Sequence, residues 1–161
     1  MNCFFPMIRS ILLHPDSHLH LSSASVSADE LRSLAFQSFL DDLEETLKKA
    51  DGVGLAAPQV GMRKRAIIVR TGDRLCAFIN PKIISVSKRL AEGEEGCLSV
   101  PGAFGIVDRH VSVKIKALTR TGERILVKAT NLEAVIFQHE IDHLNGVLFI
   151  DKIKRWTKPP K

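Results

Sequence analysis

The residues of this chain most able to do chemistry lie at positions 138–143, which contain the pattern His-Glu-x-x-His. His139 and His143 are spaced so that a helix would place both imidazoles on one face, where they can bind a single metal ion. Glu140 would then lie close enough to hydrogen-bond a water molecule on that ion. Taken alone, the pattern also fits a solvated helix face, so a third metal ligand is needed to distinguish the two interpretations.

Cys97 is the candidate for the third ligand, although a lone cysteine is more often a buried apolar thiol. It follows Gly96, whose lack of a side chain lets the backbone approach closely. Two imidazoles and one thiolate leave an open position for water, as in catalytic rather than structural metal sites. A metal lowers the pKa of its bound water toward neutrality, and Glu140 could carry the proton to a departing amine. The pattern therefore indicates metal-assisted hydrolysis.

Two helices are expected to position these residues. Ser27 and Glu30 have capping-box spacing, and the apolar residues that follow recur at helical intervals, which predicts one long helix ending at Asp51. A second capping box at Thr130 opens the helix that carries the two histidines, and Gly146 occupies its C-cap position.

Strands are expected between these helices, because short apolar or alternating runs are punctuated by turn residues. The last two runs flank a turn at residues 119–122 and should form a hairpin. The runs are residues 66–69, 75–79, 83–86, 111–117 and 125–127. Strands segregated from helices predict an α+β fold, with antiparallel β-sheets packed around a central metal-binding helix.

Length and composition indicate one domain covering residues 1–161. Three cysteines cannot all pair within the chain, which favours a reducing compartment. The bacterial cytoplasm is the expected location, with an organelle as the alternative. The apolar runs are too short to span a bilayer, so we expect no membrane helix. Outside the pattern described above, we do not expect the remaining histidines or Cys3 and Cys76 to bind metal.

Three separated segments together resemble the motifs of peptide deformylases. Weaker similarity at residues 11–16 and 145–149 extends the resemblance over most of the chain. The motifs are intact and in family order, at residues 52–59 (Gly-Val-Gly-Leu-Ala-Ala-Pro-Gln), 95–99 (Glu-Gly-Cys-Leu-Ser) and 139–143 (His-Glu-Ile-Asp-His). The resemblance implies hydrolysis of the N-formyl group from the N-terminal formyl-methionine of newly synthesised proteins, with release of formate.

The resemblance also implies a ligand set and a cofactor. Cys97, His139 and His143 would bind one metal ion, with Glu140 as the catalytic acid and base. In this family the metal is typically Fe2+, with Zn2+, Ni2+ or Co2+ as substitutes.

Further roles follow from the resemblance alone. The side-chain amide of Gln59 and the backbone N–H of Leu98 would stabilise the oxyanion of the tetrahedral intermediate. Asp142 and Arg109 would form an ion pair that holds the metal-binding helix in place.

The formyl-methionine side chain needs an apolar pocket. Leu132, Val135 and Ile136 fall on the same helix face as the two histidines, so we expect them to line it, although each taken alone would be ordinary core. Val53 and Gly54 of the first motif are the other substrate-binding candidates.

Two alternatives remain open at this point. A zinc metallopeptidase could use the same helix, although its third ligand is usually a histidine or a carboxylate. A basic ribosome-binding module with a structural metal would leave Glu140 without a role.

Partners are suggested by the motifs and by the net charge of +5. The expected partner is a nascent formyl-methionyl polypeptide, with transient ribosome contact and neither membrane nor DNA binding. The densest basic stretch is C-terminal, and it is either a solvated tail or a nucleic-acid contact. It contains Lys152, Lys154, Arg155, Lys158 and Lys161.

Overall fold

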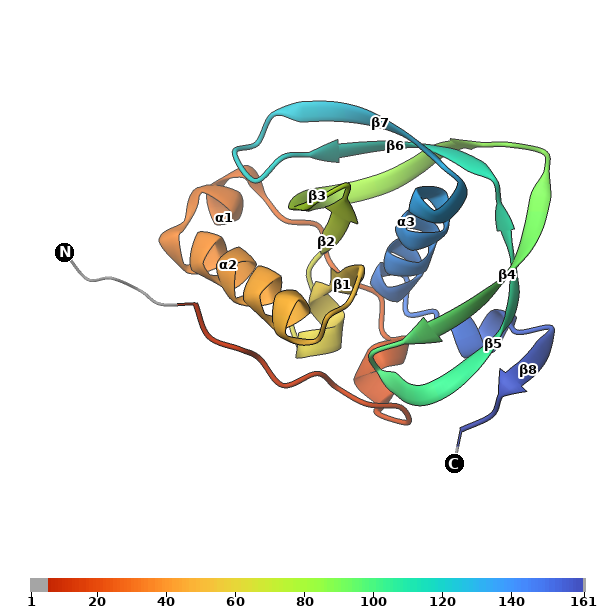
Figure 1. Ribbon diagram of the computed structural model, residues 1–161. Helices are drawn as coiled ribbons and strands as arrows, with labels where there is room; N and C mark the ends of the chain where they lie inside the picture. Colours follow the sequence, from red (N-terminus) through yellow and green to blue (C-terminus); the bar gives the residue numbers. More distant parts are fainter. Residues whose placement is uncertain (1–5, 161) are drawn as a thin grey trace.

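Helix α3 (Asn131–Leu144) occupies the centre of the computed structural model, which describes residues 6–160 (Figure 1). A five-stranded and a three-stranded β-sheet, both antiparallel, pack around this helix. The α+β architecture expected from the sequence is therefore confirmed. Cys3 and Lys161 lie outside the described residues.

The five-stranded sheet has the order β1-β2-β3-β6-β7 and contains all the strands expected from the apolar runs. Two of those runs, residues 75–79 and 83–86, belong to one long strand that passes through Asn80 and Pro81 with a change of register. The expected hairpin is formed by β6 and β7. The strands are β1 (Gly54–Ala56), β2 (Ala66–Thr71), β3 (Arg74–Val86), β6 (Ser112–Leu118) and β7 (Arg124–Thr130).

The three-stranded sheet was not expected from the sequence. Its strands are β4 (Leu90–Cys97), β5 (Val100–His110) and β8 (Arg155–Lys158), in the order β4-β5-β8. The glycines of β4 and β5 resemble turn signals, but two of them allow close packing: a Cβ on Gly96 would overlap Phe104, and one on Gly105 would overlap Ile153.

The prediction of a single N-terminal helix is wrong in one respect: the chain forms two helices, divided at Ser33. Helix α1 (Ala28–Arg32) ends at Ser33, whose backbone is extended (φ −67°, ψ 141°), and α2 (Leu34–Lys49) begins directly after it. The Ser33 hydroxyl donates to the carbonyl of Glu30 and accepts from the N–H of Phe36. One side chain thus caps both helices, which a count of apolar spacing cannot reveal.

Helix α3 begins and ends where the sequence predicted, but the expected capping box is absent. Thr130 still belongs to β7 and its side chain makes no capping hydrogen bond. Asn131, the first residue of α3, has a left-handed backbone (φ 53°). The chain therefore enters the helix through this residue and not through a capping box. At the far end, Gly146 has φ 74°, as expected of a residue that stops a helix.

The hydrophobic core lies on both faces of the five-stranded sheet. On one face, Phe78, Ile115 and Phe137 belong to a buried cluster shared with α3. On the other face, α2 covers β1, β2 and the start of β3, with Leu43 and Ile68 in a second cluster. None of the helices in residues 6–160 is both long and apolar enough to cross a membrane.

Three short 3-10 helices complete the described chain: η1 (Ser17–His20), η2 (Ala57–Val60) and η3 (Phe149–Lys152). The segment before η1 runs along α2 and then joins the first two motifs. The N–H of Leu12 donates to the carbonyl of Gln59 at 2.7 Å, and the N–H of His14 donates to that of Ser99 at 2.8 Å. The N-terminal segment therefore holds η2 beside the turn between β4 and β5.

Candidate active site

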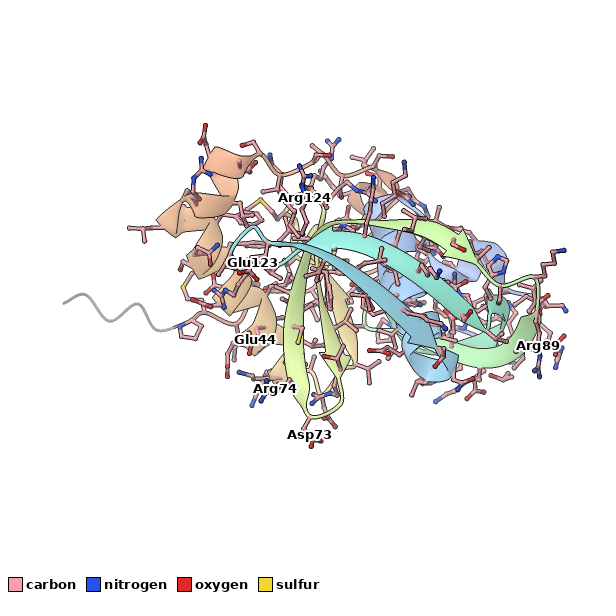
Figure 2. All side chains as sticks on the ribbon, turned by 90° about the horizontal axis from the view of Figure 1, so that it is seen from above. Glu44, Asp73, Arg74, Arg89, Glu123 and Arg124 are labelled. Carbon is pink, nitrogen blue, oxygen red and sulfur yellow. The ribbon has the colours of Figure 1, made fainter. Side chains whose placement is uncertain are left out.

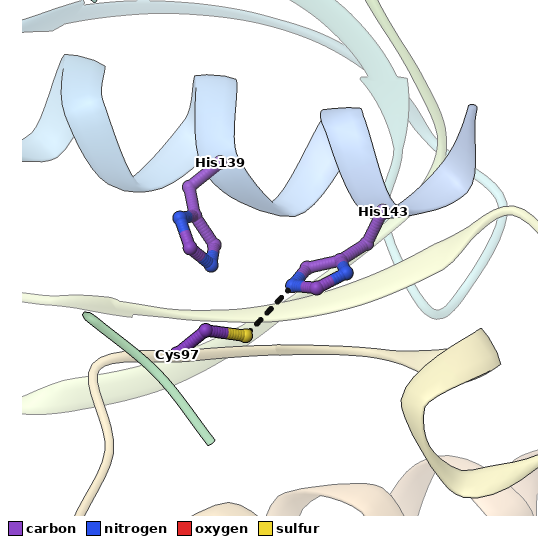
Figure 3. Close-up of side chains that lie close together, drawn as sticks. All are labelled: Cys97, His139 and His143. Carbon is purple, nitrogen blue, oxygen red and sulfur yellow. Dashed lines mark hydrogen bonds between the residues drawn. The ribbon is translucent and has the colours of Figure 1, made fainter. Parts of the chain in front are cut away.

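The three residues expected to bind metal converge in the structure. His139 and His143 project from one side of α3 toward Cys97 at the end of β4 (Figure 3). One ligand atom from each residue lies within 4.8 Å of the other two, and the Cys97 Sγ is 3.3 Å from the His143 Nε2. The site therefore joins α3 to a strand that is distant in sequence.

Glu95 orients the site, and the sequence interpretation had given it no role. Its carboxylate accepts from Arg109 Nε at 2.7 Å and from Arg109 Nη2 at 3.0 Å, and it contacts His139 Nδ1 at 2.8 Å. This contact turns the Nε2 of His139 toward Cys97, as an outer carboxylate does for metal-binding histidines. Its position could have been inferred from the strand period, because Glu95 and Cys97 are two residues apart and share one face.

The expected ion pair between Arg109 and Asp142 is present, with Arg109 Nη1 2.5 Å from Asp142 Oδ2. Arg109 is buried, and its guanidinium bridges the two carboxylates of Glu95 and Asp142. Lys152 adds a second cation to Asp142 at 2.7 Å. The network ties β4 and β5 to α3, and removing one member would leave a buried charge uncompensated.

The two histidines have opposite electrostatic surroundings. Burial lowers the pKa of His139, but hydrogen bonds to Cys97 and Glu95 and the charge of Glu140 outweigh it and raise the pKa to about 10. Burial lowers the pKa of His143 well below its usual range, and the nearby charges of His139 and Arg109 lower it further. Burial also opposes the ionisation of Glu95, but His139 and Arg109 lower its pKa to about 2.

Glu140 is buried beside the first motif and lacks a partner for one oxygen. Its Oε2 makes no hydrogen bond within residues 6–160. Burial raises the pKa of Glu140 to about 7, so the carboxylate and the carboxylic acid are both populated near neutral pH. Gly54 packs directly on this group, because a Cβ at that position would overlap the carboxylate.

Gln59 is also buried, and its hydrogen bonds define which way its amide points. The Oε1 accepts from the N–H of Ala56 at 2.9 Å, so the Nε2 faces the site. This nitrogen donates to the Ser99 hydroxyl at 3.1 Å and lies 3.6 Å from the Cys97 Sγ. Leu98 lies between Cys97 and Ser99 in the turn that joins β4 to β5. Both sequence-predicted oxyanion donors therefore lie next to the metal-ligand candidates.

A cleft of about 510 Å³ opens onto these residues. All five sequence-predicted substrate-binding residues line it: Val53, Gly54, Leu132, Val135 and Ile136. Ile136 is buried, whereas Leu132 is 68% exposed at the rim. The opposite wall, which includes Pro101 and Phe104 of β5, was missed because β5 itself was missed.

The residues present fit a bound metal ion. The donor set of one thiol and two imidazoles suits a transition metal, and the surroundings that raise the pKa of His139 also favour a cation. The unpartnered Oε2 of Glu140 calls for a further polar group in the cleft, such as water.

The family model described as Polypeptide deformylase matches residues 8–159. The chain belongs to the polypeptide deformylase family. Peptide deformylase 1 of Clostridium acetobutylicum is 45% identical over 146 residues, which cover 91% of this chain and 95% of the relative. Peptide deformylase of Acetivibrio thermocellus is 49% identical over 124 residues, which cover 74% of this chain and 70% of the relative.

Solved deformylase structures share the fold. The class I type b peptide deformylase of Acinetobacter baumannii with bound Met-Ala-Ser has a TM-score of 0.88 at 38% identity, covering 92% of this chain and 100% of its own. A peptide deformylase from Legionella pneumophila has a TM-score of 0.85 at 39% identity, and the match covers 91% of this chain and 86% of the Legionella chain.

Membership in the deformylase family decides between the interpretations left open by the sequence. The chain is a hydrolase of protein biosynthesis that deformylates newly made peptides, and neither a zinc peptidase nor a non-catalytic module. Deformylases depend on a metal ion, and the cluster of Cys97, His139 and His143 provides a site for one.

Proposed function

We propose that residues 1–161 form one catalytic domain in which Cys97, His139 and His143 hold the metal ion of the deformylase reaction. The observation that carries this proposal is the convergence of the three side chains within 4.8 Å, beside a buried carboxylate with an unpartnered oxygen. When bound, the ion would lower the pKa of a water molecule and make it available as a nucleophile at the formyl carbon.

Glu140 moves the proton in this mechanism. Its pKa of about 7 suits a group that must accept a proton and then release it at neutral pH. It takes the proton of the attacking water and delivers it to the methionine nitrogen, which leaves poorly unless protonated. Gly54 allows the carboxylate to occupy this position, because a Cβ on residue 54 would overlap it.

The oxyanion is stabilised by the Gln59 side chain and the Leu98 backbone N–H. The N–H of Ala56 already orients the Gln59 amide with its Nε2 toward the site, so the amide need not turn over to serve as donor. Donors held in place before the reaction stabilise developing charge without the cost of reorganisation. The Ser99 hydroxyl, which accepts from the Gln59 Nε2, restrains the same group.

The methionine side chain of the substrate enters the apolar part of the cleft, against Leu132, Val135 and Ile136. Val53 and Gly54 form the adjacent wall and contact the peptide backbone. The Met-Ala-Ser complex of the Acinetobacter baumannii relative supports a short peptide as the occupant. The partly apolar lining of the cleft suits methionine better than a charged side chain.

Fe2+ is the proposed metal in the cell, with Zn2+, Ni2+ and Co2+ as substitutes. A thiolate with two imidazoles can bind all four ions. Which metal is bound in the cell therefore depends on the supply of each ion as well as on the affinity of the site for it. Metal analysis of protein purified without oxygen tests this assignment, and zinc as the sole metal in fully active protein would contradict it. We also propose that the enzyme works in the cytoplasm on nascent formyl-methionyl chains and contacts the ribosome transiently.

The proposal is tested by Glu140→Gln. An amide can still hydrogen-bond water but cannot accept its proton, so turnover of a formyl-methionyl peptide should fall by about 100 to 10,000-fold while the metal is retained. Formate release and metal content per chain are the two measurements. A loss below about tenfold with unchanged metal content would remove Glu140 from the mechanism. Cys97→Ala is the matched control, because it should lose the metal together with the activity.

A further inference from the structure

The outer face of β3, β6 and β7 carries a group of exposed basic side chains, which we call the basic face. Figure 2 views the molecule from above, onto these three strands, with Arg124 labelled at the turn of the hairpin. The three strands contain no aspartate or glutamate. The basic face consists of Lys82, Lys114, Lys116, Arg124 and Lys128.

The strand register places these residues on one side of the sheet. Lys114 lies directly opposite Lys128 on β7, and Lys116 lies directly opposite Lys82 on β3. Paired side chains in a sheet are about 5 Å apart at their Cβ atoms, and like charges at that separation repel one another. The strand pairing therefore concentrates positive charge that the sequence distributes over separate segments.

The same side of the sheet changes character along its length. Ile68, Ile79 and Leu118 belong to the apolar part, which packs in the cluster under α2. Beyond that helix this side carries Lys82, Lys114, Lys116 and Lys128, with the exposed Leu126 directly opposite Lys116. Arg124 lies opposite Leu118, at the edge of the apolar part. The four lysines thus occupy the part of this surface that α2 leaves uncovered.

None of the five residues of the basic face forms an ion pair within residues 6–160. The C-terminal stretch behaves differently, although it is the densest basic run in the sequence. Lys152 pairs with Asp142, and Lys154 and Arg155 both pair with Glu92. Lys158 forms no ion pair in the described part of the chain, but the other three described basic residues of this stretch do, so most of the uncompensated charge compared here is on the sheet.

We propose that the basic face binds the phosphate backbone of a folded RNA. Exposed lysines without acidic partners suit phosphates, because they release counterions without breaking internal ion pairs. None of the five residues lines the catalytic cleft, so RNA and substrate peptide could bind together. This binding is independent of the proposed reaction.

A hollow of about 520 Å³ extends the basic face at one side. Lys82 and Lys116 line it together with Arg65, which adds a further cation. The one acidic residue of its lining, Asp142, already pairs with Arg109 and Lys152. A phosphate group could enter this hollow without meeting a free carboxylate.

The side chains of the basic face favour a base-paired RNA over two other polyanions. Single-stranded binding uses aromatic rings on which bases stack, and membrane-surface binding uses aromatic and apolar side chains that insert among the lipids. The one aromatic residue of β3, β6 and β7 is Phe78, which is buried, and the exposed large apolar side chains of these strands are Ile84, Val86 and Leu126. Contacts to the backbone of an RNA helix need neither aromatic rings nor inserted apolar side chains.

The test measures binding of a fluorescent RNA duplex of about 20 base pairs by anisotropy over a series of salt concentrations. The basic-face variant combines Lys82→Gln, Lys114→Gln and Lys128→Gln. The matched control combines Lys48→Gln, Lys154→Gln and Arg155→Gln, which removes the same charge from residues that already have ion pairs. A third variant replaces the same basic-face lysines by arginine.

The wild-type protein should bind with a slope of log affinity against log salt of about −4, because each phosphate contact contributes roughly −0.7 to −0.9. The basic-face variant should lose two to three units of that slope, and about 100-fold in affinity near 50 mM salt. The control and the arginine variant should keep the slope within about one unit. All of them should deformylate a formyl-methionyl peptide at the wild-type rate.

Three outcomes would overturn the proposal: no RNA binding by the wild-type protein, an equal loss in the control, or binding to vesicles containing phosphatidylglycerol without binding to RNA. An equal loss in the control would indicate net charge alone as the cause. Failure of peptide deformylation in the wild-type protein would contradict the proposed reaction and leave the RNA measurement intact.

Discussion

At the scale of single residues, two contacts hold the side chains proposed to act in catalysis. Glu140 is buried against a glycine, and Gln59 is held by a backbone N–H. Both side chains are buried and closely packed, so the proposed site should respond sharply to small changes in volume.

Gly54→Ala should slow catalysis without removing the metal. The added methyl group overlaps the Glu140 carboxylate and must displace it, and a shift of about 1 Å can cost on the order of 100-fold in rate. Turnover of a formyl-methionyl peptide and metal content per chain measure the two effects. Gly93→Ala is the control, because a Cβ there meets no atom within 4 Å, and it should be nearly neutral. Equal losses in both variants would mean that contact with Glu140 is not the cause.

The proposed methionine pocket makes a second prediction at this scale. Burying a methionine side chain contributes about 1.5 to 3 kcal/mol, so a formyl-alanyl peptide should lose roughly 10 to 150-fold in kcat/KM relative to the formyl-methionyl peptide. Val135→Phe should reduce this preference, because the added volume excludes the long side chain and leaves room for the short one. If the variant slows both peptides equally, Val135 does not line the methionine pocket.

At the scale of elements, the site depends on the junction between the β4-β5 hairpin and α3. Arg109 of β5 reaches Glu95 of β4 and Asp142 of α3, so one guanidinium sets the separation of three elements. The planar fork of arginine can engage both carboxylates at once, which the single ammonium of lysine cannot reproduce. The ligands on α3 and β4 thus hold their spacing through a neighbour that is not itself a ligand candidate.

The break between α1 and α2 allows a prediction on stability. Ser33→Ala removes the hydroxyl that caps α2, and losing such a cap costs about 1 kcal/mol, or roughly 2 to 4 °C in Tm for a chain of this size. Ser38→Ala, within the same helix, should leave Tm unchanged or slightly higher, because alanine is the better helix former. Thermal unfolding followed by circular dichroism measures both. A drop of the same size in Ser38→Ala would show that capping is not the reason.

For the whole molecule, the proposed metal would join the two sheets. Cys97 comes from the three-stranded sheet, whereas His139 and His143 come from the helix packed on the five-stranded sheet. A ligand that binds the folded state alone stabilises it in proportion to the logarithm of its concentration over its Kd. Metal content and global stability should therefore change together.

Removing the metal from nickel-loaded protein should lower Tm by about 5 to 15 °C, because saturation at 100 to 1,000 times Kd is worth about 2.7 to 4.1 kcal/mol. Thermal unfolding with and without a chelator measures the change, and adding nickel back should restore Tm. Cys97→Ala is the control and should not respond to the chelator. An unchanged Tm after complete metal removal would contradict a metal that joins the sheets.

The sequence by itself determined the local geometry. The helical period placed His139 and His143 on one face with Glu140 beside them, and the structure has all three on α3 as expected. Strand alternation likewise predicted the β6-β7 hairpin. These predictions held because they depend on residues a few positions apart, whose spacing the backbone geometry dictates. The capping at Ser33 is just as local but was missed, because a serine within an amphipathic pattern does not disturb the apolar period.

Only the tertiary structure decided which distant residues meet. Cys97 and His143 are 46 positions apart, and their contact depends on a β4-β5 hairpin whose glycines concealed it in the sequence. Glu95 acquired its partners in the same way, from β5 and α3. The basic face arose when strand pairing brought Lys82 beside Lys116 and Lys114 beside Lys128. The physical reason is that such contacts depend on packing and charge over the whole chain. The spacing of residues within one helix or strand carries no information about them.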